Sequence, residues 1–192
     1  MGGGQSHPSV TEDLLEDYTT LTYLSKGEIL YLMKKFKSID PDKVLADYQH
    51  RFSRDKIIQK FDVLRNNPFQ DRIFRVFSSK RDDSFSFEDL LDLCSAMSAD
   101  CPPDVRATWA FRIYDLDEDN QITERDICEI IDRLLDTKKN DQNKLDDESK
   151  KKISKNILDE IKLDHSDGIS LGEFKYILAR FPEFETSFYF RM

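Results

Sequence analysis

The chain has 192 residues, 39% of them hydrophobic, and its acidic residues outnumber the basic ones 38 to 29. The resulting formal charge of −9 argues against a nucleic-acid-binding surface, which needs basic side chains to meet phosphates. No apolar run approaches the roughly 18 residues that span a bilayer, and the three cysteines do not pair evenly, so we expect a soluble intracellular protein with reduced thiols.

The first 24 residues form an N-terminal segment with one recognisable motif. The start "MGGGQS" fits the pattern M-G-x-x-x-[ST], with Gly2 as the acceptor and Ser6 at the preferred position. N-myristoylation of Gly2 is therefore one hypothesis, and a plain glycine-rich start without a lipid is the other.

Residues 25–100 have the pattern of a helical lobe. Apolar residues at i, i+3, i+4 and i+7 spacing predict amphipathic helices through Ile29, Leu32, Met33 and Phe36, and through Leu90, Leu93, Cys94 and Met97. Further helices are expected at 55–64 and 68–77. The stretch 28–64 reads as a degenerate helix–loop–helix unit, with a middle too long and too basic for an ion loop. In the loop 78–89, "SSKRDDSFSFED", Lys80 stands at position 3 and position 1 lacks an acid, so we expect no ion there.

The break "CPPD" (101–104) cannot continue a helix, and a second lobe is expected at 104–181, with helices at 104–114 and 149–161. Its first loop, "DLDEDNQITERD" (115–126), matches the EF-hand pattern, which supplies oxygen ligands from positions 1, 3, 5, 7, 9 and 12. The predicted ligands of a Ca²⁺ or Mg²⁺ ion are Asp115, Asp117, Asp119, the Gln121 carbonyl and Asp126. Asn120 replaces the usual glycine at position 6, which asparagine tolerates because it enters the left-handed region readily.

Position 12 of this loop is an aspartate where such loops normally have glutamate. Asp126 is one methylene shorter, so it should struggle to give both oxygens to the metal. Losing an oxygen weakens Ca²⁺ binding and moves the site towards the six-coordinate geometry of Mg²⁺. We therefore expect moderate affinity and poor discrimination between the two ions.

The loop "KLDHSDGISLGE" (162–173) ends on a glutamate but begins with a lysine. Asp164, Ser166, the Gly168 carbonyl and Glu173 form a tentative, weak second metal site. The ammonium of Lys162 at position 1 removes one anionic ligand and repels a divalent ion at short range. The glycine also comes one place late in the loop, which makes the turn less favourable.

The three loops share one plan, because position 8 is Phe85, Ile122 or Ile169 and position 12 is always an acid. Helix–loop–helix units cannot bury their apolar faces alone and pair through a short β-ribbon at position 8. The expected fold is all-α, with four EF-hand units in two lobes, short β-ribbons between paired loops and a C-terminal helical extension at 182–192.

The C-terminal stretch "RFPEFETSFYFRM" (180–192) carries five aromatic residues. It is either a permanent core element or a segment that covers an apolar groove of the second lobe and competes with a partner helix. The candidate groove residues are Phe111, Ile127, Ile131, Leu135, Leu158, Phe174, Leu178, Phe181, Phe184 and Phe188.

These motifs, with "NPFQDRIFRVFS" (67–78), "AFRIYDLDEDN" (110–120) and "FPEFETSFYFRM" (181–192), resemble the calcium- and integrin-binding family of EF-hand proteins over nearly the whole chain. The resemblance implies two ion-free N-terminal hands, ion binding in the C-terminal lobe and N-myristoylation. It also implies binding of helical segments of membrane proteins, either integrin α-subunit tails or transmembrane channel-like mechanotransduction proteins. The loop 115–126 matches the family at Asp115, Asp117, Asp119 and Asp126, and the loop 162–173 only at Asp164 and Glu173.

The resulting functional hypothesis is a non-enzymatic regulatory or auxiliary subunit, peripheral at the plasma membrane, that clasps a partner helix. The alternative is a calcineurin-B-like or recoverin-like calcium switch that regulates an enzyme. The chain's three histidines are scattered, and the sequence has no glycine-rich phosphate loop, so we expect no enzymatic activity.

Overall fold

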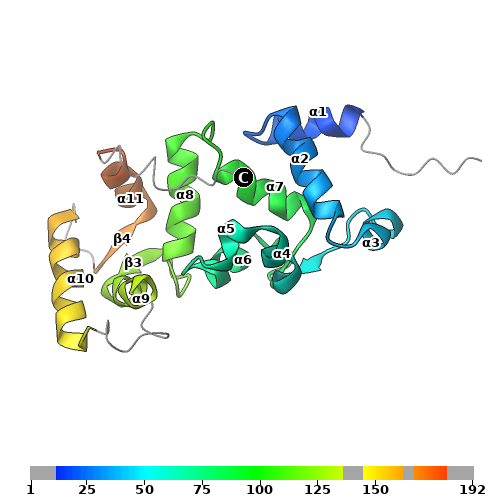
Figure 1. Ribbon diagram of the computed structural model, residues 1–192. Helices are drawn as coiled ribbons and strands as arrows, with labels where there is room; N and C mark the ends of the chain where they lie inside the picture. Colours follow the sequence, from blue (N-terminus) through cyan, green and yellow to red (C-terminus); the bar gives the residue numbers. More distant parts are fainter. Residues whose placement is uncertain (1–11, 136–144, 162–166, 181–192) are drawn as a thin grey trace, which may run out of the picture. The chain divides into compact units, whose positions relative to one another are not determined.

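A computed structural model describes residues 12–135, 145–161 and 167–180 (Figure 1). These residues are mostly helical and contain two small two-stranded sheets, in agreement with the predicted all-α class. None of the described helices is long and apolar enough to cross a membrane. Contacts divide the chain into two compact units, of which the first holds described residues 12–66 and 77–101.

The elements of the first unit are α1 (Glu12–Leu21), α2 (Lys26–Lys37), α3 (Pro41–Ala46), β1 (Phe52–Ser53), α4 (Arg54–Lys60), α5 (Asp62–Arg65), β2 (Ser84–Phe85) and α7 (Phe87–Ala96). The predicted apolar faces of α2 and α7 are buried, as the helical spacing requires. β1 and β2 pair antiparallel, with Phe52 opposite Phe85. The ring of Phe36 lies 5.0 Å from that of Phe52 and 5.6 Å from that of Phe87, so helix and ribbon share one aromatic core.

Three local features of this unit differ from the sequence predictions. Helix α1 was not expected, and it packs through Tyr18, whose ring meets Phe87 and whose hydroxyl donates to Glu88. Helix α3 lies in the middle of the unit 28–64, where a long loop was expected. It begins at Pro41, a residue that suits the first position of a helix. The prediction of one continuous helix at 55–64 was also wrong. Two helices, α4 and α5, cover this stretch, and the break between them is at Phe61, whose side chain is buried in the core.

The second unit comprises described residues 67–76 and those from Pro102 onwards. Its elements are α6 (Gln70–Phe77), α8 (Pro103–Tyr114), β3 (Gln121–Thr123), α9 (Glu124–Leu134), α10 (Asp147–Ile161), β4 (Gly168–Ser170) and α11 (Leu171–Leu178). All of α6 except its last residue, Phe77, belongs to this unit. β3 and β4 pair antiparallel with Ile122 opposite Ile169, which confirms the ribbon predicted at position 8. Both residues join Phe111, Ile127 and Leu158 in the core. The predicted extension at 182–192 lies outside the described residues.

Candidate metal centre

The loop between α8 and α9 turns without a glycine. Glu118 and Asn120, at loop positions 4 and 6, have φ of 62° and 69°. Both lie in the left-handed region, which asparagine enters more easily than most side chains. The turn predicted at Asn120 is thus present. It folds the acidic first half of the loop back towards the start of α9.

This turn brings three carboxylates together. Oxygens of Asp115, Asp117 and Asp126 all lie within 4.8 Å of one another, and the first and last of these residues are buried. Burial raises the pKa of Asp115, with repulsion from Asp119 and Asp126 adding to the effect and amide hydrogen bonds opposing it. Clustered, partly desolvated negative charge of this kind favours a bound cation, and the all-oxygen donor set suits Ca²⁺ or Mg²⁺.

The other predicted ligands lie at the margin of the cluster. Asp119 does not belong to it, and its Oδ1 accepts the Gln121 amide at 2.8 Å. Gln121 begins β3 and is exposed. The loop therefore brings together Asp115, Asp117 and Asp126, at positions 1, 3 and 12. Asp119 and Gln121, at positions 5 and 7, lie where the chain enters the ribbon.

Both oxygens of Asp126 take part in the loop's own hydrogen bonds. Oδ1 accepts the Leu116 amide at 3.0 Å, and Oδ2 accepts the amide and hydroxyl of Thr123 at 2.9 and 2.8 Å. The same short side chain thus caps the first turn of α9 and closes the carboxylate cluster. A metal that needs a second oxygen from Asp126 must compete with these donors.

We expect Asp126→Glu to raise the preference for Ca²⁺ over Mg²⁺ by at least about tenfold, or about 1.4 kcal/mol. The added methylene lets one carboxylate reach the metal with both oxygens, and glutamate at this helix position still caps α9. Competitive calorimetry of Ca²⁺ in a Mg²⁺ background measures the ratio. Asp126→Asn is the matched control, which should weaken both ions, and an unchanged ratio in Asp126→Glu would contradict the assigned role.

An arginine from α6 holds the loop in place, a contact that no pattern in the sequence predicted. The buried Arg72 donates from Nη2 to the carbonyls of Arg112 and Asp115, at 2.9 and 2.7 Å, and from Nη1 to Glu118 at 3.1 Å. Arg75, one turn later, also donates to Glu118 at 2.9 Å. Its hydrogen bond is the main reason why the pKa of Glu118 falls to about 2, and Arg72 contributes further. The end of α8 and the first loop position are therefore held in place by α6.

The tentative second site is described only in part, because Lys162, Asp164 and Ser166 lie outside the described residues. Glu173 accepts the amide and hydroxyl of Ser170 through Oε2, at 2.9 and 2.7 Å, while its buried Oε1 has no hydrogen-bond partner among the residues described. Gly168 lets β4 lie close to β3, because a Cβ at this position would lie 2.8 Å from Oε1 of Gln121 and 3.0 Å from Cβ of Gln121. This close approach explains the glycine at position 7 of the loop.

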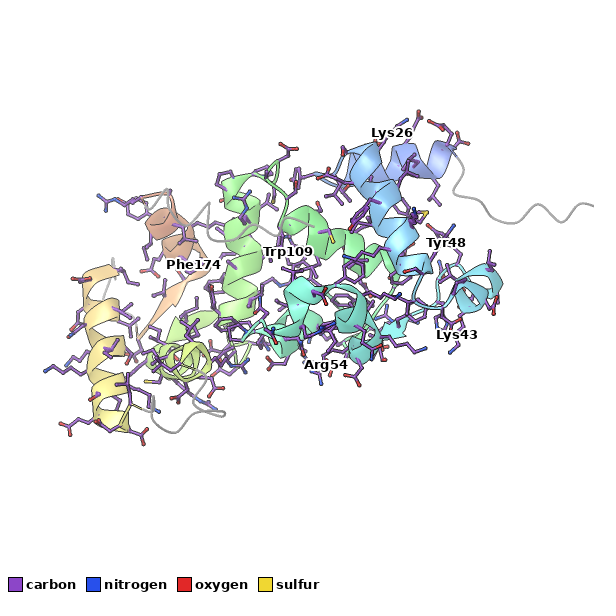
Figure 2. All side chains as sticks on the ribbon, viewed as in Figure 1. Lys26, Lys43, Tyr48, Arg54, Trp109 and Phe174 are labelled. Atoms are coloured by element: carbon purple, nitrogen blue, oxygen red, sulfur yellow. The ribbon has the colours of Figure 1, made fainter. Side chains whose placement is uncertain are left out.

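The described groove candidates fall into two groups by burial. Phe111, Ile127 and Leu158 are buried in the core of the second unit, whereas Ile131, Leu135, Phe174 and Leu178 are half-buried. Phe181, Phe184 and Phe188 lie outside the described residues. Phe174 turns towards α8 (Figure 2), where its ring meets that of Phe111 at 5.6 Å. None of the residues of α11 is fully buried, so its apolar side keeps an accessible edge.

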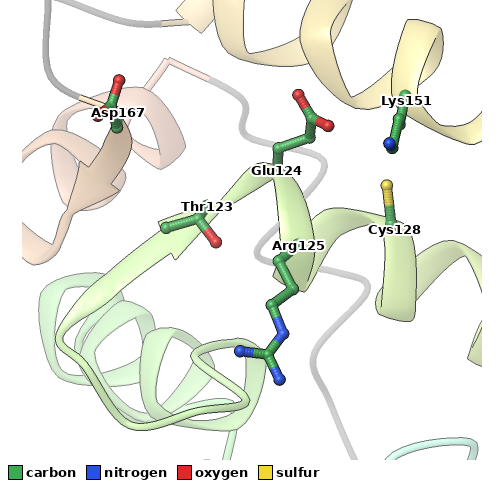
Figure 3. A pocket seen from close by; sticks show the side chains of 6 residues that line it. All are labelled: Thr123, Glu124, Arg125, Cys128, Lys151 and Asp167. Carbon is green, nitrogen blue, oxygen red and sulfur yellow. The ribbon is translucent and has the colours of Figure 1, made fainter.

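An open pocket lies beside the start of α9. Figure 3 shows its lining side chains, which are Thr123, Glu124, Arg125, Cys128, Lys151 and Asp167. The thiol of Cys128 lies 3.6 Å from the Ser154 hydroxyl, which gives it a structural contact. One lining residue, Arg125, lies 3.5 Å from Asp117 of the carboxylate cluster, and the mixed charges of the pocket do not favour one class of ligand.

No family model matches the chain. It is 31% identical to calcium and integrin-binding family member 2 of Drosophila melanogaster over 194 aligned residues, which cover 98% of this chain and 100% of the relative. It is 29% identical to the human proteins named family member 2 and family member 3, again over 98% of this chain and the whole of each relative.

Proposed function

Because the chain belongs to the calcium and integrin-binding family, we propose that it is a non-enzymatic regulatory subunit that binds Ca²⁺ or Mg²⁺ and a helix of a membrane protein. The proposed subunit has four EF-hand units, and Asp115, Asp117 and Asp126 bind its principal ion. The favoured partner is an integrin α-subunit tail, in keeping with the names of the relatives. A cytoplasmic segment of a transmembrane channel-like protein is the second candidate.

The observation that carries the proposal is the half-buried apolar side of α11. Leu171, Phe174 and Ile177 pack against the core of the second unit without being fully enclosed, and Leu178 is equally half-buried. An amphipathic helix laid along this edge would cover them, with anchors spaced three and four residues apart. Complete burial of each large apolar side chain is worth roughly 1.5–3 kcal/mol, so a few such anchors suffice for binding.

Lipidation of Gly2 would place this subunit at the cytoplasmic face of the plasma membrane. A single myristoyl chain gives only weak, reversible binding, with a partition constant of about 10⁴ M⁻¹, so stable residence there should require the protein partner. Intact-mass measurement of the protein made in eukaryotic cells should show the acyl group, and Gly2→Ala should remove it. A wild-type mass without the lipid would contradict this part of the proposal.

Leu178→Glu should weaken binding of an integrin α-tail peptide by about tenfold or more, because it puts a charge on the proposed contact surface. Fluorescence anisotropy with a labelled peptide measures the effect, with a peptide from a channel-like protein in parallel. Tyr176→Glu is the matched control, since Tyr176 is exposed on the same helix. Equal binding by both variants would remove α11 from the contact, and binding of the channel peptide alone would reverse the order of the two partners.

A further inference from the structure

The loop 78–89, predicted to hold no ion, has the conformation of the acidic loop 115–126. Its positions 4 and 6, Arg81 and Asp83, have φ of 52° and 56°, as left-handed as their counterparts in the acidic loop. The position 2 amide of Ser79 donates to Asp89 at position 12, at 3.1 Å. Asp89 also accepts the amide of Ser86 at position 9, at 3.0 Å. The loop therefore keeps the ion-loop fold without the acid at position 1.

The interior of this loop is filled by the guanidinium of Arg51. Nη2 donates to the Ser78 hydroxyl at 2.9 Å, to Asp82 at 2.9 Å and to the Ser84 carbonyl at 2.6 Å. Nη1 donates to the Ser79 hydroxyl at 3.0 Å and lies 2.7 Å from Asp89 Oδ2. These partners include positions 1, 5, 7 and 12, four of the positions from which an EF-hand loop supplies its metal ligands.

The position of Arg51 follows from the ribbon. Arg51 immediately precedes β1, and the pairing of Ser53 with Ser84 and of Phe52 with Phe85 sets that strand against the loop. The side chain is 12% exposed and that of Asp89 only 3%. Arginine stays charged at any ordinary pH, and its planar fork can serve several oxygens at once, as a metal ion does.

Charge balance supports the same assignment. The hydrogen bond from Arg51 is the first cause of the lowered pKa of Asp82. Burial by itself would lower the pKa of Arg51, but hydrogen bonds and charge from Asp82 and Asp89 outweigh it and raise that pKa. Without the guanidinium, the buried carboxylate of Asp89 would lose its countercharge, which is strongly unfavourable in a protein interior.

We propose that Arg51 is an internal cation that takes the place of the divalent ion in the loop 78–89. The first unit is thereby held in an ion-filled arrangement at any concentration of Ca²⁺ or Mg²⁺. The loop oxygens of Ser78, Asp82, Ser84 and Asp89 remain a latent divalent site that Arg51 blocks. Divalent ions then act on the second unit alone, through the loop 115–126.

The test is a gain of binding in a chain whose acidic loop has been silenced by Asp115→Ala. In that background, Ser78→Asp restores an acid at position 1 and Arg51→Ala removes the internal cation. Calorimetry should show one new Ca²⁺ site in the triple variant, at least about tenfold stronger than in the matched control that carries Arg54→Ala in place of Arg51→Ala. Arg54 is a suitable control because its ion pair with Asp83, at 3.6 Å, leaves the loop interior untouched.

Where both triple variants are folded, equal binding by the two, or no gain in either, would overturn the proposal. If the Arg51 variant unfolds without ions and refolds with Ca²⁺, the proposal is supported. If it unfolds under both conditions, hydrogen exchange of the wild-type chain decides. Amide protection across 78–89 should be the same in chelator and in Ca²⁺, while protection across 115–126 rises with the ion. A Ca²⁺-dependent change in the loop 78–89 of the wild-type chain would contradict an internal cation.

Discussion

Asp115→Ala should reduce Ca²⁺ and Mg²⁺ binding at the loop 115–126 by more than about a hundredfold, or about 2.7 kcal/mol. Asp115 is the first of the predicted ligands, is buried, and belongs to the carboxylate cluster with Asp117 and Asp126. Its two oxygens also accept the amides of Asp119 and Asn120, at 3.1 and 3.0 Å. The substitution therefore removes a charge, a ligand and two hydrogen bonds that shape the turn.

Calorimetric titration of wild type and variant measures this loss. Glu124→Ala is a matched control, since it removes an acid from position 10 of the same loop, outside the cluster. It costs only the favourable interaction of an acid with the first turn of α9, about 0.3–1 kcal/mol, and should leave the affinity within about fivefold of wild type. Two strong sites that survive Asp115→Ala would place the principal site elsewhere.

Arg72→Ala should destabilise the second unit by about 2–4 kcal/mol and also weaken ion binding. The guanidinium bonds the carbonyls of Arg112 and Asp115, so its removal leaves these acceptors without their partner at the end of α8. The ion pair with the partly exposed Glu118 is screened by solvent and adds little to the loss. Affinity should fall because the backbone of Asp115 is no longer held.

Urea unfolding followed by circular dichroism, in chelator and then in Ca²⁺, separates the two effects. Arg75→Ala is the control, because Arg75 meets the same Glu118 with a side chain that is 43% exposed. Its loss should cost less than about 1 kcal/mol. If Arg72→Ala and Arg75→Ala behaved alike, the carbonyl contacts of Arg72 would not stabilise the loop.

The parts of the fold that follow a repeating pattern were predictable from the sequence. Apolar spacing identified α2 and α7, and the large residue at position 8 identified the ribbon that joins Ile122 to Ile169. These features depend on residues near one another in the chain, or on one motif that recurs. The loop motif likewise placed Asp115, Asp117 and Asp126 in one cluster, because a twelve-residue turn brings its ends together.

The features that sequence reasoning missed depend on contacts between distant residues. Arg51 reaches Asp89, and Arg72 reaches the carbonyl of Asp115, across many intervening residues. A single arginine in a helix or before a strand has no local pattern that distinguishes it from a solvated charge. The loop 78–89 did carry a hint, because it keeps an acid at position 12 while lacking one at position 1. A buried acid without a metal needs another cation nearby.

Anomalous diffraction from crystals grown with Mn²⁺ locates divalent ions by position, so it can show directly whether the loop 115–126 holds the ion while Arg51 fills the loop 78–89. We expect a strong peak enclosed by Asp115, Asp117 and Asp126. Inside the loop 78–89 we expect the guanidinium of Arg51 and no peak. A peak within the loop 78–89 with Arg51 displaced, or no peak at the cluster of Asp115, Asp117 and Asp126, would contradict it.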